Sequence, residues 1–168
     1  MSNFPKLIPA FTTNIVLDPP ISVGSVSHGA PLTIATFRSE NSFLRSEPDY
    51  PIKVNAKFVH GVDNIRQDPS GKHLRLDVTS TLSDTTGAYI LYKYSGIITL
   101  TPQIGAVLSG APDAATTEFG NVVTHVLFET GSEALRGMEE KIYVGSGRFV
   151  VEKGKPVVVE YMISEVVA

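Results

Sequence analysis

The chain has 168 residues, 42% hydrophobic and 18% charged, which suits one domain of ordinary size with a buried core. A formal net charge of -3 without a basic stripe argues against a nucleic-acid partner, and the lack of cysteine excludes disulfides and thiolate chemistry. The N-terminal MSNFPKLIPAF has no apolar run long enough for a signal peptide or membrane span, so we expect a cytoplasmic protein with no membrane partner.

Short runs rich in Val, Ile, Thr, Tyr and Phe recur along the chain, and turn residues (Gly, Pro, Asp, Ser) separate them. We predict strands at 11–18, 31–38, 52–60, 73–83, 88–100, 121–129, 140–151 and 156–167. Eight strands joined by short turns favour an antiparallel up-and-down sheet, which hides its edges most completely by closing into a barrel.

A single short helix is expected at 132–140, with Ser132 as its cap and Glu133 in its first turn. We find no repeat or linker, so residues 1–168 are interpreted as one all-β barrel domain. In 156–167 neither alternating face is uniformly polar, which favours a barrel whose outside is partly covered by a partner subunit or a helix. A barrel of about eight strands encloses side chains or one small ligand.

Patterns for metal and cofactor chemistry are missing from the sequence. The four histidines, His28, His60, His73 and His125, form no ligand spacing, so no metal is expected. The glycine-rich YVGSGRF is followed by strand-like residues rather than a helix, so Gly145 and Gly147 indicate a bulge or a tight bend and not a dinucleotide site. The serine nucleophile motif GxSxG is absent. We therefore expect no cofactor.

Several polar residues lie within predicted strands. The run VVTHVLFET carries His125 and Glu129 on one face, Asp63 lies in VHGVDNI, and Tyr92 and Lys93 lie mid-strand. Arg38 ends LTIATFR. Each charged group is either a solvated rim residue or a group that faces the barrel cavity, where a low dielectric would raise a carboxyl pKa into the range of a useful proton donor.

The order of motifs resembles a known family. The stretch FVHGVDNIRQDPSGKHLRLDVTSTLSDTTGAYILYKYSGI resembles PGGADW…DG…LDARYTL.T.DGA.I.V…G, and FETGSEALRGMEEKIYVGSGRF resembles FETG…YAWLN…FVGTG. Together, from about residue 21 to 166, they are similar to the family numbered 3237 among domains of unknown function. The resemblance implies a lipocalin-like antiparallel barrel with a cavity, assembled as a dimer or larger. In fungal members it implies cofactor-free ring formation in natural-product pathways.

The resemblance also implies site residues. Asp63 matches the acid of ADW, Glu129 the acid of FET, and Asp77 the acid of LDARYTL. Other positions depart from the pattern, because Thr79 and Ser80 replace an arginine and a tyrosine, Asn64 replaces a tryptophan, and residues 137–139 replace WLN. These losses of aromatic and cationic groups would reshape the cavity, so they put a single family-wide reaction in doubt.

The first hypothesis is a cofactor-independent cyclase or isomerase of fungal secondary metabolism. It closes a ring on an aromatic, prenylated or polyketide substrate, for example by intramolecular hydroalkoxylation. Glu129 or Asp63 would donate the proton, and Lys93, Tyr92 or His125 would accept or orient the phenol proton. We assign Glu129, Asp63 and Lys93 to catalysis, and substrate binding to Arg38, Tyr92, His125, Phe128 and Tyr161. The alternatives are a barrel that carries an apolar metabolite and a structural subunit filled by its own side chains.

Overall fold

The computed structural model describes residues 3–27 and 29–168, so Met1, Ser2 and His28 lie outside it. Its elements, in chain order, are β1 (Lys6–Val16), β2 (Ile21–Gly24), β3 (Leu32–Thr36), β4 (Phe43–Ser46), β5 (Asn55–Gln67), β6 (His73–Asp84), β7 (Tyr89–Thr99), α1 (Pro102–Ser109), β8 (Val122–Thr130), the 3₁₀ helix η1 (Glu133–Met138), β9 (Ile142–Val150) and β10 (Val158–Val167).

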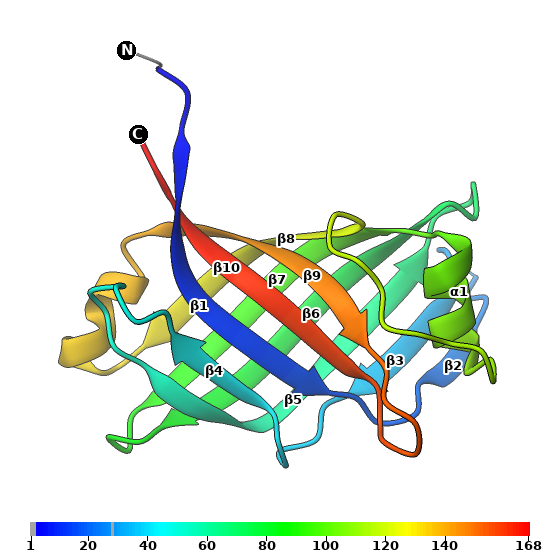
Figure 1. Cartoon of the computed structure of the whole chain (residues 1–168), viewed down its shortest axis with the longest axis horizontal. Helices are drawn as coiled ribbons and strands as arrows, with labels where there is room; N and C mark the ends of the chain where they lie inside the picture. Colours follow the sequence, from blue (N-terminus) through cyan, green and yellow to red (C-terminus); the bar gives the residue numbers. More distant parts are fainter. Residues whose placement is uncertain (1–2, 28) are drawn as a thin grey trace.

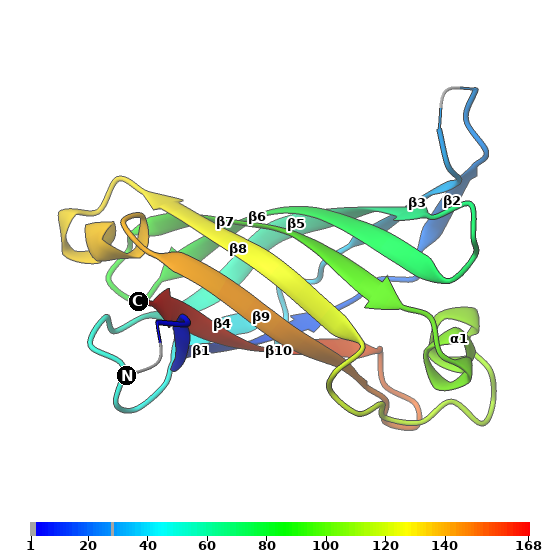
Figure 2. The same cartoon turned by 90° about the horizontal axis from the view of Figure 1, so that it is seen from above.

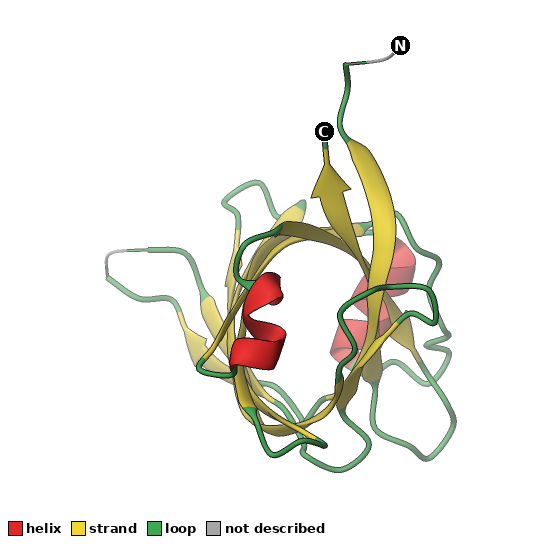
Figure 3. Cartoon of the chain, turned by 90° about the vertical axis from the view of Figure 1, so that its left-hand side faces the viewer, coloured by secondary structure: helices red, strands yellow, loops and turns green. Residues whose placement is uncertain are grey.

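The predicted antiparallel barrel is confirmed. The sheet order is β2-β3-β5-β4-β1-β10-β9-β8-β7-β6, and the β5–β6 pairing closes it into a barrel (Figures 1 and 3). Eight strand positions form the wall, because β3 and β4 pair with successive parts of β5 and share one position. β1 and β2 likewise face β4 and β3, as one long hairpin with a break around the Leu17–Phe37 bridge.

Two short helices lie at opposite ends of the barrel (Figures 1 and 3). The helix expected at 132–140 is the 3₁₀ helix η1. The second helix, α1, was not predicted. Thr101 caps it through Ile104 N–H, Pro102 occupies its first turn, and Gly110 ends it in the left-handed conformation at φ 66°. Both helices are too short to cross a membrane, which holds for every helix within the described ranges.

Aromatic side chains fill much of the barrel interior. Near η1, the ring of Phe11 packs against Tyr50, Phe128 and Tyr143 at centroid distances of 5.1, 5.4 and 5.5 Å. The Tyr50 hydroxyl donates to Glu165 Oε2 at 2.7 Å, and Lys141 holds the other oxygen of that carboxylate at 2.6 Å. This end of the barrel is therefore filled by aromatic side chains and a buried ion pair.

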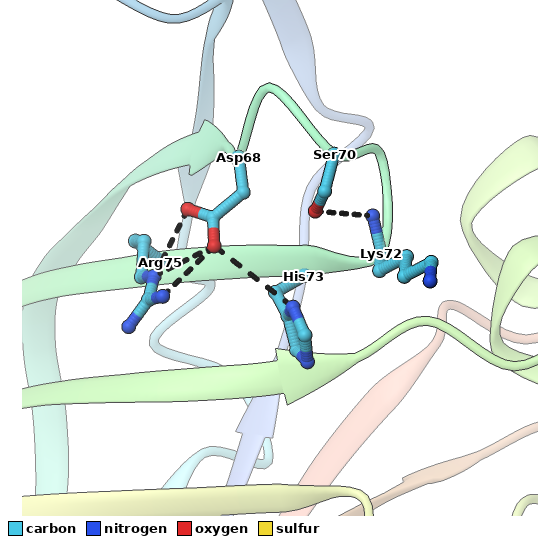
Figure 4. Close-up of polar contacts among 5 residues, drawn as sticks. All are labelled: Asp68, Ser70, Lys72, His73 and Arg75. Carbon is cyan, nitrogen blue, oxygen red and sulfur yellow. Dashed lines mark hydrogen bonds and ion pairs between the residues drawn. The ribbon is translucent and has the colours of Figure 1, made fainter.

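The β5–β6 turn is fixed by charge (Figure 4). Arg75 donates to Asp68 at 2.8 Å from Nη2 and 3.0 Å from Nε, and His73 Nδ1 lies 3.9 Å from the same carboxylate. These hydrogen bonds from Arg75 hold the pKa of Asp68 below its usual range. The turn sets the register of β6 against β5, and this register places Asp63 opposite Val78.

Candidate functional site

A small cavity lies inside the barrel at the α1 end, with a volume of about 40 Å³. Its wall is mainly apolar and comes from β1, β3, β5, β6, β7, β9 and β10, while Leu108 of α1 contributes from the barrel end. The polar side chains that line it are Asp63, Tyr94 and Tyr161. A carboxyl group and two phenols therefore share a small, mostly apolar space.

Asp63 is the central group of this site. Its side chain is only 6% exposed, although it is an acid on a β-strand. Burial raises its pKa from 3.8 to about 7, against the opposing effect of a hydrogen bond that Oδ1 accepts from the backbone N–H of Asp77 at 3.0 Å. The nearby Asp77 carboxylate raises this pKa further. Asp63 is thus poised to hold or release a proton close to neutral pH.

The strand ladder explains why the Asp63 carboxylate finds a backbone donor. Cα pairing between β5 and β6 runs through Asp63↔Val78 and resumes at Arg66↔Arg75. Between these points, Asp63 Oδ1 accepts a hydrogen bond from the backbone N–H of Asp77. In a regular ladder, a backbone carbonyl of the neighbouring strand would accept that hydrogen bond. The acid therefore sits at a local interruption of the barrel wall, and its orientation is fixed from β6.

Tyr94 and Tyr161 form a coupled pair beside Asp63. Their ring centroids are 5.2 Å apart, at an interplanar angle of 59°. Burial raises the pKa of both phenols, and the neighbouring Asp63 carboxyl raises them further. Both side chains therefore remain neutral at physiological pH, where they can donate and accept hydrogen bonds.

Two more hydroxyls are buried nearby without a hydrogen-bond partner among the described residues. They belong to Ser80 and Tyr92, which face each other across β6 and β7. The Tyr92 ring stacks on Phe128 at 5.3 Å and contacts Tyr94 at the same centroid distance. Because burial without a hydrogen bond is costly, these hydroxyls are available to a polar atom of a bound molecule.

The glycines of YVGSGRF make room for side chains of the two neighbouring strands. A Cβ at Gly147 would lie 2.5 Å from Tyr161 Cε1, and one at Gly145 would lie 2.5 Å from Thr124 Oγ1. The β9–β10 register is continuous at this point, with Tyr161 opposite Gly147. Of the predicted bulge or tight bend, the bulge is therefore wrong: Gly147 leaves space for the buried ring of Tyr161, and Gly145 for Thr124 Oγ1.

Half of the predicted site residues point into the barrel. Asp63, Tyr92, Phe128 and Tyr161 are buried, from 0 to 6% exposed. Tyr94 was missed as a site residue, although it has the same strand parity as Tyr92 and its inward orientation follows from that spacing. Ser80 was noted only as a departure from the family pattern and was not assigned to the site.

The other four predicted residues lie on the outer surface, so the expectation that they face the cavity is wrong. Glu129 and His125 have the opposite strand parity to Val126 and Phe128, and both are exposed. Lys93 alternates with the buried Tyr92 and Tyr94 in the same way. Arg38 pairs with Asp18 at 2.7 Å in solvent. In β7 and β8 the aromatic side chains face the barrel interior, so the charged side chains that alternate with them face the solvent.

Within residues 3–27 and 29–168, no group of three or more His, Asp or Glu side chains lies close enough together to hold a metal ion. The arrangement that remains is a buried, protonatable carboxyl with neutral phenols around it.

Comparisons with known proteins place this geometry in context. A family model described as "Protein of unknown function (DUF3237)" matches residues 5–166. A search of curated proteins gives no match. Among solved structures, the chain is similar to a conserved protein of unknown function from Rhodopseudomonas palustris, with a TM-score of 0.74, 16% identity, and 99% of this chain and 100% of that chain covered.

Two further structures share the fold. A β-barrel-like protein from Acinetobacter baumannii AYE has a TM-score of 0.72 at 17% identity, with 99% of each chain covered. An enzyme from Penicillium herquei has a TM-score of 0.64 at 16% identity, with 99% of this chain and 98% of that chain covered. At these identities the comparison establishes the barrel fold and nothing about the reaction.

Proposed function

The chain belongs to the DUF3237 family of proteins of unknown function, and on that premise we propose that it is a cofactor-independent acid–base enzyme. It is a cyclase or isomerase of fungal secondary metabolism that acts on a small aromatic or prenylated substrate inside the barrel. One observation carries the proposal: Asp63 holds a carboxyl with a pKa of about 7 in an apolar cavity. Such a position costs stability, and carboxyl groups with a pKa raised in this way cluster at functional sites.

The reaction that suits this site is intramolecular hydroalkoxylation. The carboxyl of Asp63 transfers its proton to one carbon of a prenyl alkene, so that a C–H bond forms and the adjacent carbon becomes a cation. The phenol oxygen of the same substrate attacks that cation and forms the C–O bond. The phenol proton then returns to the Asp63 carboxylate, which regenerates the acid and requires no redox partner.

The surrounding side chains support each charge change. The rings of Tyr94 and Tyr161 line the cavity and Tyr92 packs against Tyr94, so aromatic rings would stabilise a carbocation at this buried site. The neutral phenols of Tyr94 and Tyr161 line the same cavity as Asp63, and their hydroxyls would relay the phenol proton back to its carboxylate. The unpartnered hydroxyls of Ser80 and Tyr92 would orient the substrate oxygen.

Access requires movement of part of the wall. A cavity of about 40 Å³ holds only a water or two, whereas sites for ligands of drug size measure about 300 to 1,000 Å³. Leu108 of α1 lines the cavity, and α1 lies beside this end of the barrel (Figure 2). The element to move is therefore α1, because it is short and joined to β8 by a long connection.

A carrier for a small hydrophobic metabolite is the second candidate. The apolar lining favours it, since such a wall binds by burial of apolar surface alone. The carrier differs from the enzyme in one respect, because binding alone requires no carboxyl group at position 63. The likeness to the Penicillium herquei enzyme is compatible with the catalytic proposal and does not decide between the two.

The test is incubation of the full chain with a panel of ortho-prenylated phenols in D₂O. Turnover gives a ring-closed product of unchanged formula that carries one carbon-bound deuterium, and kcat/KM falls above pH about 7 as Asp63 ionises. Asp63→Asn abolishes product but not binding. Glu129→Gln removes an outward carboxyl and serves as the matched control. Stoichiometric binding of a substrate without any product would contradict the enzyme proposal and support the carrier proposal.

A further inference from the structure

The outer surface of the barrel carries a groove that shares no lining residue with the interior cavity. Its volume is about 810 Å³, against about 40 Å³ inside the barrel, and lies in the range of sites for small molecules. Residues of β1, β4, β5, β9 and β10 line it, together with residues 38–42 and the connection between β9 and β10. Strands β1 and β10 lie side by side at the front of Figure 1. We call this hollow the outer groove.

Part of the lining of the outer groove is apolar. The apolar side chains are Val16, Phe43, Val150, Pro156 and Val158. They come from distant parts of the chain, and the strand ladders hold them together, since Val158 pairs with both Val16 and Val150. An apolar body placed in the groove would leave water at these side chains, which is a favourable contribution to binding.

The charged part of the lining has an excess of cations. It holds four cationic side chains and two acidic ones, although the chain as a whole has a net charge of -3. Two of the cations are neutralised, because Lys155 pairs with Glu152 and Arg38 pairs with Asp18. The second acid, Glu40, forms no ion pair in the part of the chain that the structure describes. The groove therefore keeps two cations without a paired counter-charge.

Strand pairing brings these two cations, Arg45 and Lys57, to one place. Phe43 lies opposite Lys57 in the β4–β5 ladder, and Arg45 lies two residues along β4 on the same exposed face. The Arg45 guanidinium carbon is 4.2 Å from the centroid of the Phe43 ring. Arg45 and Lys57 are thus diagonal neighbours on the sheet, a relation that places side chains about 7–8 Å apart. Two cations at this separation repel each other, so an anion between them stabilises both.

A buried polar atom lies on the other side of the Phe43 ring. Asn14 pairs with Phe43 in the β1–β4 ladder and lines the groove. Its Oδ1 is buried and has no hydrogen-bond partner among residues 3–27 and 29–168. Because a buried acceptor without a partner costs stability, a polar atom of a bound molecule would be favoured at this position.

We propose that the outer groove binds a small organic anion. Its apolar body lies against Val16, Phe43 and Val158, and one carboxylate or phosphate group lies between Arg45 and Lys57. A guanidinium binds either group through two parallel hydrogen bonds, and the lysine adds a second positive charge. Nucleic acid fits less well, because the two acids in the lining and the net charge of -3 oppose a polyanion. The inference does not depend on the proposed function, since the two sites are separate spaces.

The test is an NMR titration of the isotope-labelled full chain with naphthoate and with naphthyl phosphate. At least one of these anions is expected to bind saturably and to shift the amide resonances of residues 14–16, 38–45 and 150–158. The anion that binds more tightly identifies the preferred group. Neutral naphthol and inorganic phosphate are the controls, and each is expected to bind at least about tenfold more weakly, because each lacks one half of the recognised chemistry.

Charge variants provide an independent measurement. Arg45→Gln and Lys57→Gln are each expected to raise the dissociation constant of the bound anion at least about tenfold. Lys72→Gln, in the β5–β6 turn (Figure 4), is the matched control and leaves it unchanged. Circular dichroism establishes that all three variants fold.

Three results would overturn the proposal. The first is that neither anion binds saturably, or that naphthol binds as tightly as the anions. The second is an affinity that does not change in Arg45→Gln and Lys57→Gln. The third is a set of shifts centred on Asp63 and Tyr161, which would assign the probe to the interior cavity instead.

Discussion

Replacing Asp63 by Asn should change how the stability of the barrel depends on pH. The amide has nearly the shape of the carboxyl, and its oxygen can still accept the hydrogen bond from Asp77 N–H at 3.0 Å. The substitution therefore removes the ionisation of this group and little else. In the wild-type chain, ionisation of the buried carboxyl opposes folding, because the charged form leaves water for an apolar cavity.

The size and sign follow from the pKa. Burial raises the pKa of Asp63 from 3.8 in the unfolded chain to about 7 in the folded chain. Between these pH values the folded state binds more protons than the unfolded state, so the free energy of unfolding falls as pH rises. A pKa difference of about three units corresponds to about 4 kcal/mol in the free energy of unfolding. This stability is fully present below pH 4 and is lost by pH 8. The Asp63→Asn variant has no carboxyl at this position to ionise, so its stability would not show this loss.

Urea unfolding of the two proteins at pH 4, 5, 6, 7 and 8 measures the effect. The two stabilities are expected to be similar at pH 4, and Asp63→Asn is expected to be more stable by about 4 kcal/mol at pH 8. A difference that stays constant across this range would refute the reasoning, since it would mean that Asp63 titrates normally in the folded barrel. It would also remove the main support for Asp63 as a proton donor.

Three further predictions concern packing and the outer surface. Gly147→Ala should lower the free energy of unfolding by about 1–3 kcal/mol, because the new methyl would displace the buried ring of Tyr161; Gly105→Ala in α1, with no heavy atom within 4 Å of the new Cβ, should instead be stabilising in the same urea assay. Tyr50→Phe should cost about 1–2 kcal/mol in thermal unfolding, since a buried carboxylate loses the 2.7 Å bond from that hydroxyl, and an unchanged melting temperature would contradict this. Glu129→Gln should leave the urea midpoint unchanged, and a clear loss would show that this exposed carboxylate has a structural partner.

Strand alternation carried most of the fold prediction. Runs of β-branched and aromatic residues favour strands, and the Gly, Pro and Asp residues between them favour tight turns. Strands joined by tight turns pair in antiparallel fashion. The long hairpin of β1–β4 was less predictable. The predicted strands at 11–18 and 31–38 correspond to β1 and β3, whereas β2 and β4 lie outside every predicted strand. The two sides of the hairpin break at the same level because Leu17 and Phe37 are bridged to each other there. Helix α1 escaped prediction because its eight residues hold less than three turns of periodic signal.

Alternation assigned residues to two faces without saying which face is inside. In β8 one set is Val122, Thr124, Val126 and Phe128, and the other is Val123, His125, Leu127 and Glu129. Three members of the first set and two of the second are apolar, a difference too small for local hydrophobicity to choose the inner face. The choice comes from packing: Phe128 meets Phe11 at 5.4 Å and Tyr92 at 5.3 Å, from strands distant in sequence. This is why Glu129 was misplaced.

The amino-acid sequence by itself determined a cysteine-free chain of short antiparallel strands, the turns between them and the pairs of residues that share a strand face. Only the tertiary structure decided that Asp63 lines the cavity and that Glu129 lies in water. The physical reason is that a pKa depends on everything around the carboxyl. Here those surroundings come from seven strands and one helix, which the closed barrel brings together around a single side chain.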